Sequence, residues 1–237
     1  MSFDSLVITA HPDDAEAQMG GTLAKLAGRG QAILVVDLTE GEPAELEPRG
    51  TRARQAAEAA RILGVQRLTL SHPDRLLVDD VATRIEVAGL IREHRPHTVY
   101  AIGEACVHPD HIAAASIVRA ATFLARLSKW EEVPGGETLA STEPWAVSRL
   151  FFPHCKMETP WSSFAFAIDV SDTYERKRAA LATYTSIFAK ADRLLALYEA
   201  EDQYFGRMLG VSYAEIFRSA SPVLLDDPAV ILPGVHA

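Results

Sequence analysis

The sequence predicts an α/β fold in which helices cover both faces of a Rossmann-like, mostly parallel sheet, with a small cap at the C-terminal end. Two observations predict it. Up to residue 127, short apolar and β-branched runs alternate with stretches whose apolar residues recur at three- and four-residue steps. This alternation is typical of βαβ units, whose strands pair in parallel through right-handed crossovers. From residue 128 a long polar stretch with Pro and Gly interrupts the alternation, and the remainder is expected to form the cap.

Each expected element follows from its own run of residues. The apolar runs predict strands in the first half at residues 5–10, 31–38, 67–70 and 98–102. The helical spacing predicts helices at residues 16–27, 51–63, 81–94 and 108–127. After the connection at 128–147, the same patterns predict strands at 148–152 and 164–170 and helices at 172–183 and 191–206. No internal repeat is present, so we expect a single domain over residues 1–237, with a core of about 1–127 and a cap of about 148–237.

Composition narrows the possible partners. The 237 residues carry 23 Lys and Arg against 32 Asp and Glu, a net charge of −9, and no basic cluster offers a surface for phosphate backbones. The first residues lack the pattern of a signal peptide, and no apolar run is long enough to span a bilayer. We therefore expect a cytoplasmic protein that binds neither nucleic acid nor membrane.

The two cysteines do not form a recognisable motif. Cys106 and Cys155 lie 49 residues apart, and the chain has no C-x-x-C. This spacing indicates neither a disulfide framework nor a cysteine zinc site. We expect both thiols to lie in the core or in a pocket.

Two polar segments stand where predicted strands end. A-H-P-D-D-A-E, residues 10–16, follows the first strand, and H-P-D-H, residues 108–111, follows the fourth. Ligands of open parallel sheets bind at the carboxyl ends of the strands, where we also expect the loops that carry Asp74 and Glu42. Imidazole and carboxylate groups are common zinc ligands, and a catalytic zinc takes three protein ligands. Because neighbouring side chains diverge, one carboxylate of the Asp13–Asp14 pair can bind a metal while the other faces its water.

Each of these residues also has a purely structural interpretation. Asp13, Asp14 and Asp110 could cap the helices that follow, and His108 and His111 could be surface residues. Two separate H-P-D segments at strand ends of one sheet nevertheless favour a functional site.

Three segments together resemble a known family. They are His11-Pro12-Asp13-Asp14-Ala15-Glu16, Gly20-Gly21-Thr22 and His108-Pro109-Asp110-His111. In this order they resemble the PIG-L or LmbE-like deacetylases, zinc enzymes that remove acetyl from N-acetylglucosaminyl groups. Further segments, including Asp37-Leu38-Thr39-Glu40-Gly41-Glu42 and Gly210-Val211-Ser212-Tyr213-Ala214-Glu215, are similar to the branch that contains bacillithiol-type deacetylases.

The resemblance implies a role for each matching residue. His11, Asp14 and His111 would hold Zn²⁺, and Asp13 would be the general base. His108 would stabilise the oxyanion or protonate the amine, and Asp110 would orient His108. The resemblance also implies a homo-oligomer, possibly a hexamer. Cys106 is a departure, because some relatives have a tyrosine at this place that is thought to contact the reaction intermediate.

The substrate expected from the resemblance is a small N-acetyl amino sugar, possibly N-acetylglucosaminyl malate. Arg54 is a candidate to bind it, although pairing with Glu58 on the same helix is an equally good interpretation. Diacetylchitobiose is an alternative substrate. Two other functions remain open: a metal-dependent phosphoester hydrolase, and a nucleotide-binding module suggested by Gly20-Gly21-Thr22, although no phosphate-binding glycine motif is present.

Overall fold

The computed structural model describes residues 2–42, 48–155, 164–188 and 192–224. Within them the chain forms one seven-stranded sheet with the strand order β3-β2-β1-β4-β5-β7-β6. The strands are β1 (Ser5–Thr9), β2 (Ile33–Thr39), β3 (Gln66–His72), β4 (Thr98–Ala101), β5 (Arg149–Pro153), β6 (Phe166–Asp169) and β7 (Ala214–Ser219). The helices are α1 (Asp14–Gly28), α2 (Thr51–Leu63), α3 (Val81–His94), α4 (Pro109–Leu124), α5 (Glu137–Ala140), α6 (Tyr174–Leu181), α7 (Thr185–Phe188) and α8 (Asp192–Met208). A short 3₁₀ helix covers Trp130–Glu132.

The predicted α/β class and mostly parallel sheet are confirmed. Strands β1 to β5 pair in parallel, and β7 then lies antiparallel between β5 and β6. Strand β7 was not predicted, because residues after 206 showed neither clear alternation nor a long apolar run. Its neighbours β5 and β6 complete its hydrogen bonding, so its stability comes from the sheet rather than from its own sequence.

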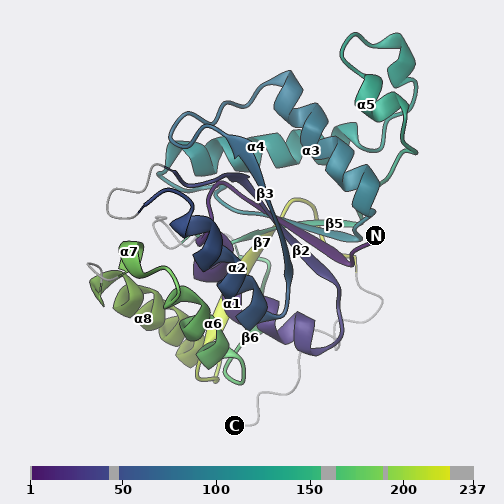
Figure 1. Cartoon of the computed structure of the whole chain (residues 1–237). Coiled ribbons are helices and arrows are strands. Elements are labelled where there is room, and N and C mark those ends of the chain that lie inside the picture. The colour runs from purple at the N-terminus through teal and green to yellow at the C-terminus, as the bar shows by residue number, and fades with distance from the viewer. Residues whose placement is uncertain (1, 43–47, 156–163, 189–191, 225–237) are drawn as a thin grey trace.

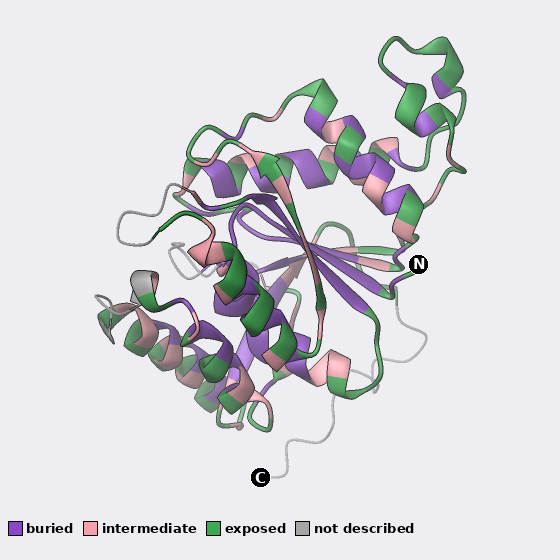
Figure 2. Ribbon diagram, in the orientation of Figure 1, coloured by how far each residue is buried: buried purple, intermediate pink, exposed green. Residues whose placement is uncertain are grey.

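Helices cover both faces of the sheet (Figure 1). Helices α3 and α4 lie on one face, whereas α1, α2, α6 and α8 lie on the other. Strand β1 is buried on both sides, because Leu6 and Ile8 belong to the first apolar cluster and Val7 belongs to the second. Figure 2 shows this burial along the central strands. The polar residues that follow β1 are therefore attached to the end of a strand that is covered on both faces.

Helix α1 has a kink at Met19, followed by two glycines that lie close to other segments. Met19 has non-helical backbone angles, with φ −148° and ψ 25°. A Cβ on Gly21 would come within 2.7 Å of Val170, and one on Gly20 within 3.0 Å of Lys177. The glycines thus allow α1 to pack closely against the segment that contains α6. Their position inside a buried helix argues against a nucleotide-binding loop.

The kink also frees two backbone N–H groups of α1, and Glu215 of β7 satisfies them. Its carboxylate accepts from the N–H of Gly21 at 3.0 Å and of Thr22 at 2.7 Å. The ammonium of Lys177 lies 2.7 Å from both Glu215 and Asp202, and all three side chains are buried. This ion cluster joins α1, α6, α8 and β7, so the first helix is fixed by the last strand.

Candidate metal centre and active site

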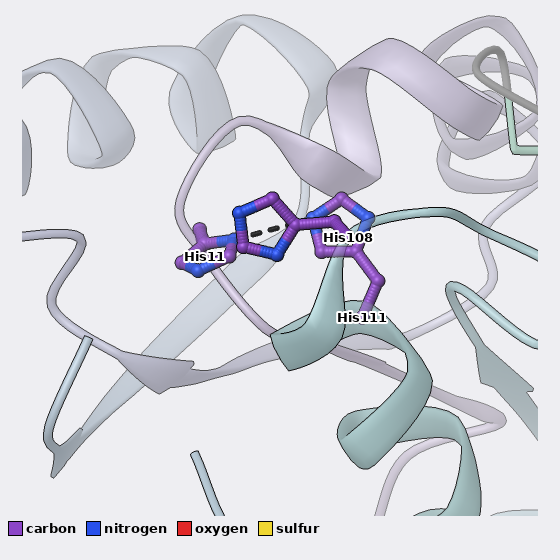
Figure 3. Close-up of side chains that lie close together, drawn as sticks. All are labelled: His11, His108 and His111. Carbon is purple, nitrogen blue, oxygen red and sulfur yellow. Dashed lines mark hydrogen bonds between the residues drawn. The ribbon is translucent and has the colours of Figure 1, made fainter. Parts of the chain in front are cut away.

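The site forms where two neighbouring parallel strands end. Strands β1 and β4 pair directly, with Ile8 opposite Ala101, so the loops that follow them leave the same edge of the sheet. The first loop carries His11, Asp13 and Asp14, and the second carries His108 and His111 at the start of α4. The predicted convergence of the two H-P-D segments is therefore present, and Figure 3 shows the three imidazoles side by side.

Two imidazole nitrogens and one carboxylate converge at the centre of the site. His11 Nδ1 lies 3.2 Å from His111 Nε2. Asp14 Oδ2 lies 3.5 Å from His11 Nδ1, and its other oxygen, Oδ1, lies 3.1 Å from His111 Nε2. A tetrahedral ion with bonds of about 2.0–2.1 Å separates its ligand atoms by about 3.3 Å. The spacing of these three groups thus fits a single metal ion of zinc's size and leaves a fourth position for substrate or water.

The side chain of Asp110 contacts His11, whereas the family resemblance implies that it would orient His108. Its carboxylate lies 3.1 Å from His11 Nε2 and accepts from the backbone N–H of Arg75 at 2.7 Å and of Leu77 at 3.3 Å. Its hydrogen bond with His108 is made by the backbone instead: the Asp110 N–H donates to His108 Nδ1 at 3.2 Å. The reason is that Asp110 lies in the first turn of α4, where its N–H reaches the capping residue while its side chain reaches the β3–α3 loop.

Asp74, from that β3–α3 loop, completes the surroundings of His11. Its Oδ1 lies 3.0 Å from His11 Nε2, and its side chain is 10% exposed. The expectation that Asp74 stands at this edge of the sheet is confirmed. With Asp74 and Asp110 on its Nε2, the ring of His11 presents Nδ1 toward Asp14 and His111, which is how carboxylates commonly orient a metal-binding histidine.

The charges in the metal-free site make both imidazoles basic. Burial lowers the pKa of His11, but the hydrogen bond and the charge of Asp14 outweigh it and raise that pKa to about 9. For His111, burial is again outweighed by Asp14, with a further contribution from Cys106, and the pKa rises to about 11. In return the two histidines hold the pKa of Asp14 well below its usual range despite its burial. Positive charge is thus stabilised where a cation would bind.

Asp13 and Asp14 diverge as expected for neighbouring side chains. Asp13 has a left-handed φ of 107°, which is uncommon for a residue other than glycine, and its Oδ1 lies 3.7 Å from Arg52 Nη1. Burial and then the charge of Asp14 raise the pKa of Asp13 to about 7. A carboxyl group with this pKa beside a metal position is suited to accept and return a proton near neutral pH.

His108 stands at the more open side of the histidine cluster. Its ring stacks on His111 with 4.6 Å between centroids and meets the edge of His11 at 4.9 Å. Burial, and then the charges of His111 and His11, lower its pKa. Because its Nδ1 accepts the Asp110 N–H, the neutral ring carries its hydrogen on Nε2.

The arginine near the site is Arg52 rather than the predicted Arg54. Arg54 is exposed, and its Nη2 donates to Thr51 Oγ1 at 2.8 Å. The two residues differ by about 200° around the helix, so only one can face the sheet. The apolar stripe of α2 contains the signal that would have identified Arg52. Arg52 lies four residues before the buried Ala56, whereas Arg54 lies four residues before the exposed Glu58.

Arg52 has buried nitrogens that could bind a substrate, and a cavity lies near the start of its helix. Two of its buried nitrogens, Nε and Nη1, have no hydrogen-bond partner within the described part of the chain. A cavity of about 300 Å³ opens between the loop after β1 and the start of α2. It is lined by Pro12, Glu40, Glu42, Arg49, Gly50, Ala53 and Thr69. Its size and polar lining are those of a site for a small ligand.

Comparison with known proteins then identifies the family. The sequence model described as PIG-L, GlcNAc-PI de-N-acetylase, matches residues 6–122, which include both H-P-D segments. The chain belongs to the PIG-L family.

Two curated relatives of this PIG-L protein have deacetylase names. It is 27% identical to a diacetylchitobiose deacetylase of Thermococcus kodakarensis, over 93% of this chain and 84% of the relative. It is 25% identical to a 1D-myo-inositol 2-acetamido-2-deoxy-alpha-D-glucopyranoside deacetylase of Tsukamurella paurometabola, over 98% of this chain and 93% of the relative.

Two solved structures share the fold over nearly the whole chain. The conserved protein TT1542 of Thermus thermophilus is 37% identical, with a TM-score of 0.85 over 95% of this chain and 98% of the other. GalB, a 4-carboxy-2-hydroxymuconate hydratase of Pseudomonas putida, is 22% identical, with a TM-score of 0.79 over 96% and 99% of the two chains. The second likeness shows the fold alone.

Among the described helices of the present protein, none has the length and apolar character needed to cross a membrane.

Proposed function

We propose that this PIG-L protein hydrolyses the N-acetyl group of a small N-acetylglucosaminyl substrate, releasing acetate and a free amine, with one zinc ion held by His11, Asp14 and His111. The observation that carries the proposal is the convergence of two imidazole nitrogens and the Asp14 carboxylate, with separations of 3.1 to 3.5 Å. Beside them the carboxylate of Asp13 lies toward Arg52 instead. The deacetylase names of the two curated relatives support the same reaction.

The residues around the metal position divide the work of amide hydrolysis. The cation would supply a Lewis acid that polarises the acetyl carbonyl and makes a neighbouring water easier to deprotonate. Asp13 accepts the proton of the attacking water at its carboxylate, since its pKa lies near 7. His108 donates its Nε2 hydrogen to the oxygen that becomes negative, and either Asp13 or His108 returns a proton to the leaving nitrogen.

Arg52 is the residue that we propose for recognition of the rest of the substrate. Its Nε and Nη1 make no hydrogen bond within the described residues, although Nη1 lies 3.7 Å from the Asp13 carboxylate. Both nitrogens can donate to a carboxylate or a hydroxyl group, and charge-assisted bonds of this kind are strong and directional. An anionic aglycone such as malate would gain more from Arg52 than an uncharged sugar. Diacetylchitobiose and N-acetylglucosaminyl inositols remain alternative substrates because curated relatives carry their names.

The experiment is a mass-spectrometric assay of acetyl loss with the zinc-loaded protein. The substrates are N-acetylglucosamine, its malate glycoside, diacetylchitobiose and an N-acetylglucosaminyl inositol. Arg52→Ala should lower kcat/KM for the malate glycoside by about 10- to 100-fold, the range for one hydrogen bond to a charged group. It should lower kcat/KM for N-acetylglucosamine less. Arg54→Ala is the matched control and should leave both values near those of the wild type.

The same assay tests the alternative of a metal-dependent phosphoester hydrolase. That function would need magnesium or a metal pair and would release phosphate from esters. Phosphate release without deacetylation of any amino sugar would refute the proposed reaction. Turnover of diacetylchitobiose alone would retain the chemistry and reject the malate substrate.

The homo-oligomer, possibly a hexamer, and the cytoplasmic location stay predictions. We propose the oligomer from the family resemblance, and light scattering that reports a monomer at micromolar concentration would contradict it. Fractionation of cells with an antibody to the protein would test the location.

A further inference from the structure

Two cysteine thiols meet directly behind the metal position. Strands β4 and β5 pair in parallel, with Tyr100 opposite Phe151, so the segments that follow them leave the same edge of the sheet. Cys106 lies in the segment after β4, and Cys155 lies two residues after β5. Their sulfurs are 2.7 Å apart, and the residues are 6% and 1% exposed.

One of the two sulfurs also contacts a residue that we assign to the metal. Cys106 Sγ lies 3.2 Å from His111 Nδ1, whereas His111 Nε2 faces Asp14 at 3.1 Å. A metal-binding histidine commonly donates its second N–H to a carboxylate or a carbonyl, which fixes the orientation and the tautomer of the ring. In this protein the sulfur of Cys106 takes that place.

We propose that Cys106 and Cys155 form a reversible oxidation site that takes hydroperoxides as its oxidant, and that their disulfide weakens metal binding through His111. The two thiol sulfurs would need to approach by about 0.6 Å to reach the length of a disulfide bond, about 2.05 Å. No other cysteine is present in the 237 residues, so each cysteine can form a disulfide within the chain only with the other.

The chemistry of the proposed site balances with one hydroperoxide. One sulfur attacks a peroxide oxygen, the O–O bond breaks, and a sulfenic acid forms as water leaves. The second sulfur attacks the sulfenic sulfur, the S–O bond breaks, and the hydroxyl leaves as a second water after it takes the remaining thiol proton. The two sulfurs lose two electrons and hydrogen peroxide gains them. A dithiol reductant reverses the bond by thiol–disulfide exchange.

The effect on the metal follows from the contact with His111, and this part of the inference rests on the proposed function. A disulfide sulfur carries no hydrogen that it could donate and no negative charge that would attract a hydrogen from His111 Nδ1. It is therefore a poor hydrogen-bond partner for that nitrogen. Loss of an outer hydrogen bond to a metal-binding histidine commonly weakens metal affinity by about 10- to 100-fold. We expect oxidation to weaken zinc binding within this range and reduction to restore it.

The first test counts thiols in the metal-free, full-length protein. After treatment with hydrogen peroxide and alkylation under denaturing conditions, intact mass should show a monomer that has lost two hydrogens and both alkylation sites, and dithiothreitol should restore them. Cys155→Ala should not form this species. Sulfinic acid at Cys106, or two intact thiols after treatment, would overturn the oxidation site.

The second test measures zinc affinity by competition with a chelator, for the oxidised and the reduced protein. The ratio of the two dissociation constants should be about 10 to 100 in the wild type and near unity in Cys155→Ala. A disulfide with an unchanged zinc affinity would overturn the control of His111. A second zinc ion bound by the reduced protein, and lost in Cys155→Ala, would show a sulfur-containing metal site instead. Neither test measures deacetylation, so both keep their meaning if the proposed activity fails.

Discussion

Asp110→Asn is the substitution that best separates the two roles considered for this residue. The carboxylate faces three N–H donors, from His11 Nε2 at 3.1 Å and from the backbone of Arg75 and Leu77 at 2.7 and 3.3 Å. An amide of the same size offers one oxygen, and its NH₂ group would face a donor. We therefore expect the orientation of His11 to be weakened, with Asp74 as the remaining carboxylate on its Nε2, while the overall fold is retained.

The expected magnitude follows from the position of Asp110 outside the ligand set. Substitution of such a partner commonly weakens metal affinity by about 10- to 100-fold, or about 1.4–2.7 kcal/mol. The zinc dissociation constant of Asp110→Asn should rise by this factor in competition with a chromophoric chelator. Asp79→Asn is the matched control, because its carboxylate binds Arg84 and Ser116 at the surface and contacts no histidine of the site. Its zinc affinity should equal that of the wild type.

The refuting result is specific. A zinc dissociation constant of Asp110→Asn within about threefold of the wild type, together with a large loss of kcat at saturating zinc, would contradict the reasoning from His11. That outcome would favour the role expected from the sequence, in which Asp110 orients His108.

Three further predictions test the site and its support. Asp13→Asn should keep its zinc and lose about 10²-fold or more in kcat, because the amide cannot accept a proton; metal analysis that shows lost zinc would instead make Asp13 a ligand. Zinc binding at pH 7.5 should release protons, since the pKa values of His11 and His111, about 9 and 11, keep both rings protonated in the metal-free site and a ligand must be neutral. Calorimetry in buffers of different ionisation enthalpy measures this release, and a value of zero would contradict those pKa values. Lys177→Met should lower the free energy of unfolding by about 3–5 kcal/mol in urea titrations, because it leaves two buried carboxylates unpaired. Arg178→Met on the same helix is the control: it removes only an exposed ion pair and should change the free energy of unfolding by less than about 1 kcal/mol.

The place of the site could be predicted because it depends on topology. Alternating strands and helices specify a parallel sheet, and a parallel sheet brings the residues after β1 and β4 to one edge. The divergence of Asp13 and Asp14 follows in the same way from the geometry of adjacent residues. These statements need only local patterns and the rules of chain connection.

The partners of particular side chains could not be predicted in this way. The carboxylate of Asp110 binds His11 because the β3–α3 loop brings two backbone N–H groups beside it, and no sequence pattern gives the path of that loop. The contact of Cys106 with Cys155 depends on the neighbouring positions of β4 and β5, which are separated by the irregular stretch at 128–147. The formation of strand β7 likewise depends on β5 and β6, which pair with it in the sheet.

The bond between Glu215 and the first helix has a consequence for synthesis of the protein. The hydrogen bond from the Gly21 N–H spans 194 residues, so its acceptor leaves the ribosome long after the helix has emerged. Until then the freed N–H groups of α1 lack this carboxylate, and the loop with His11 and Asp14 is attached to an incompletely fixed helix. The metal site is thus fixed only after β7 has been made, although its first ligand, His11, lies in the loop that follows β1.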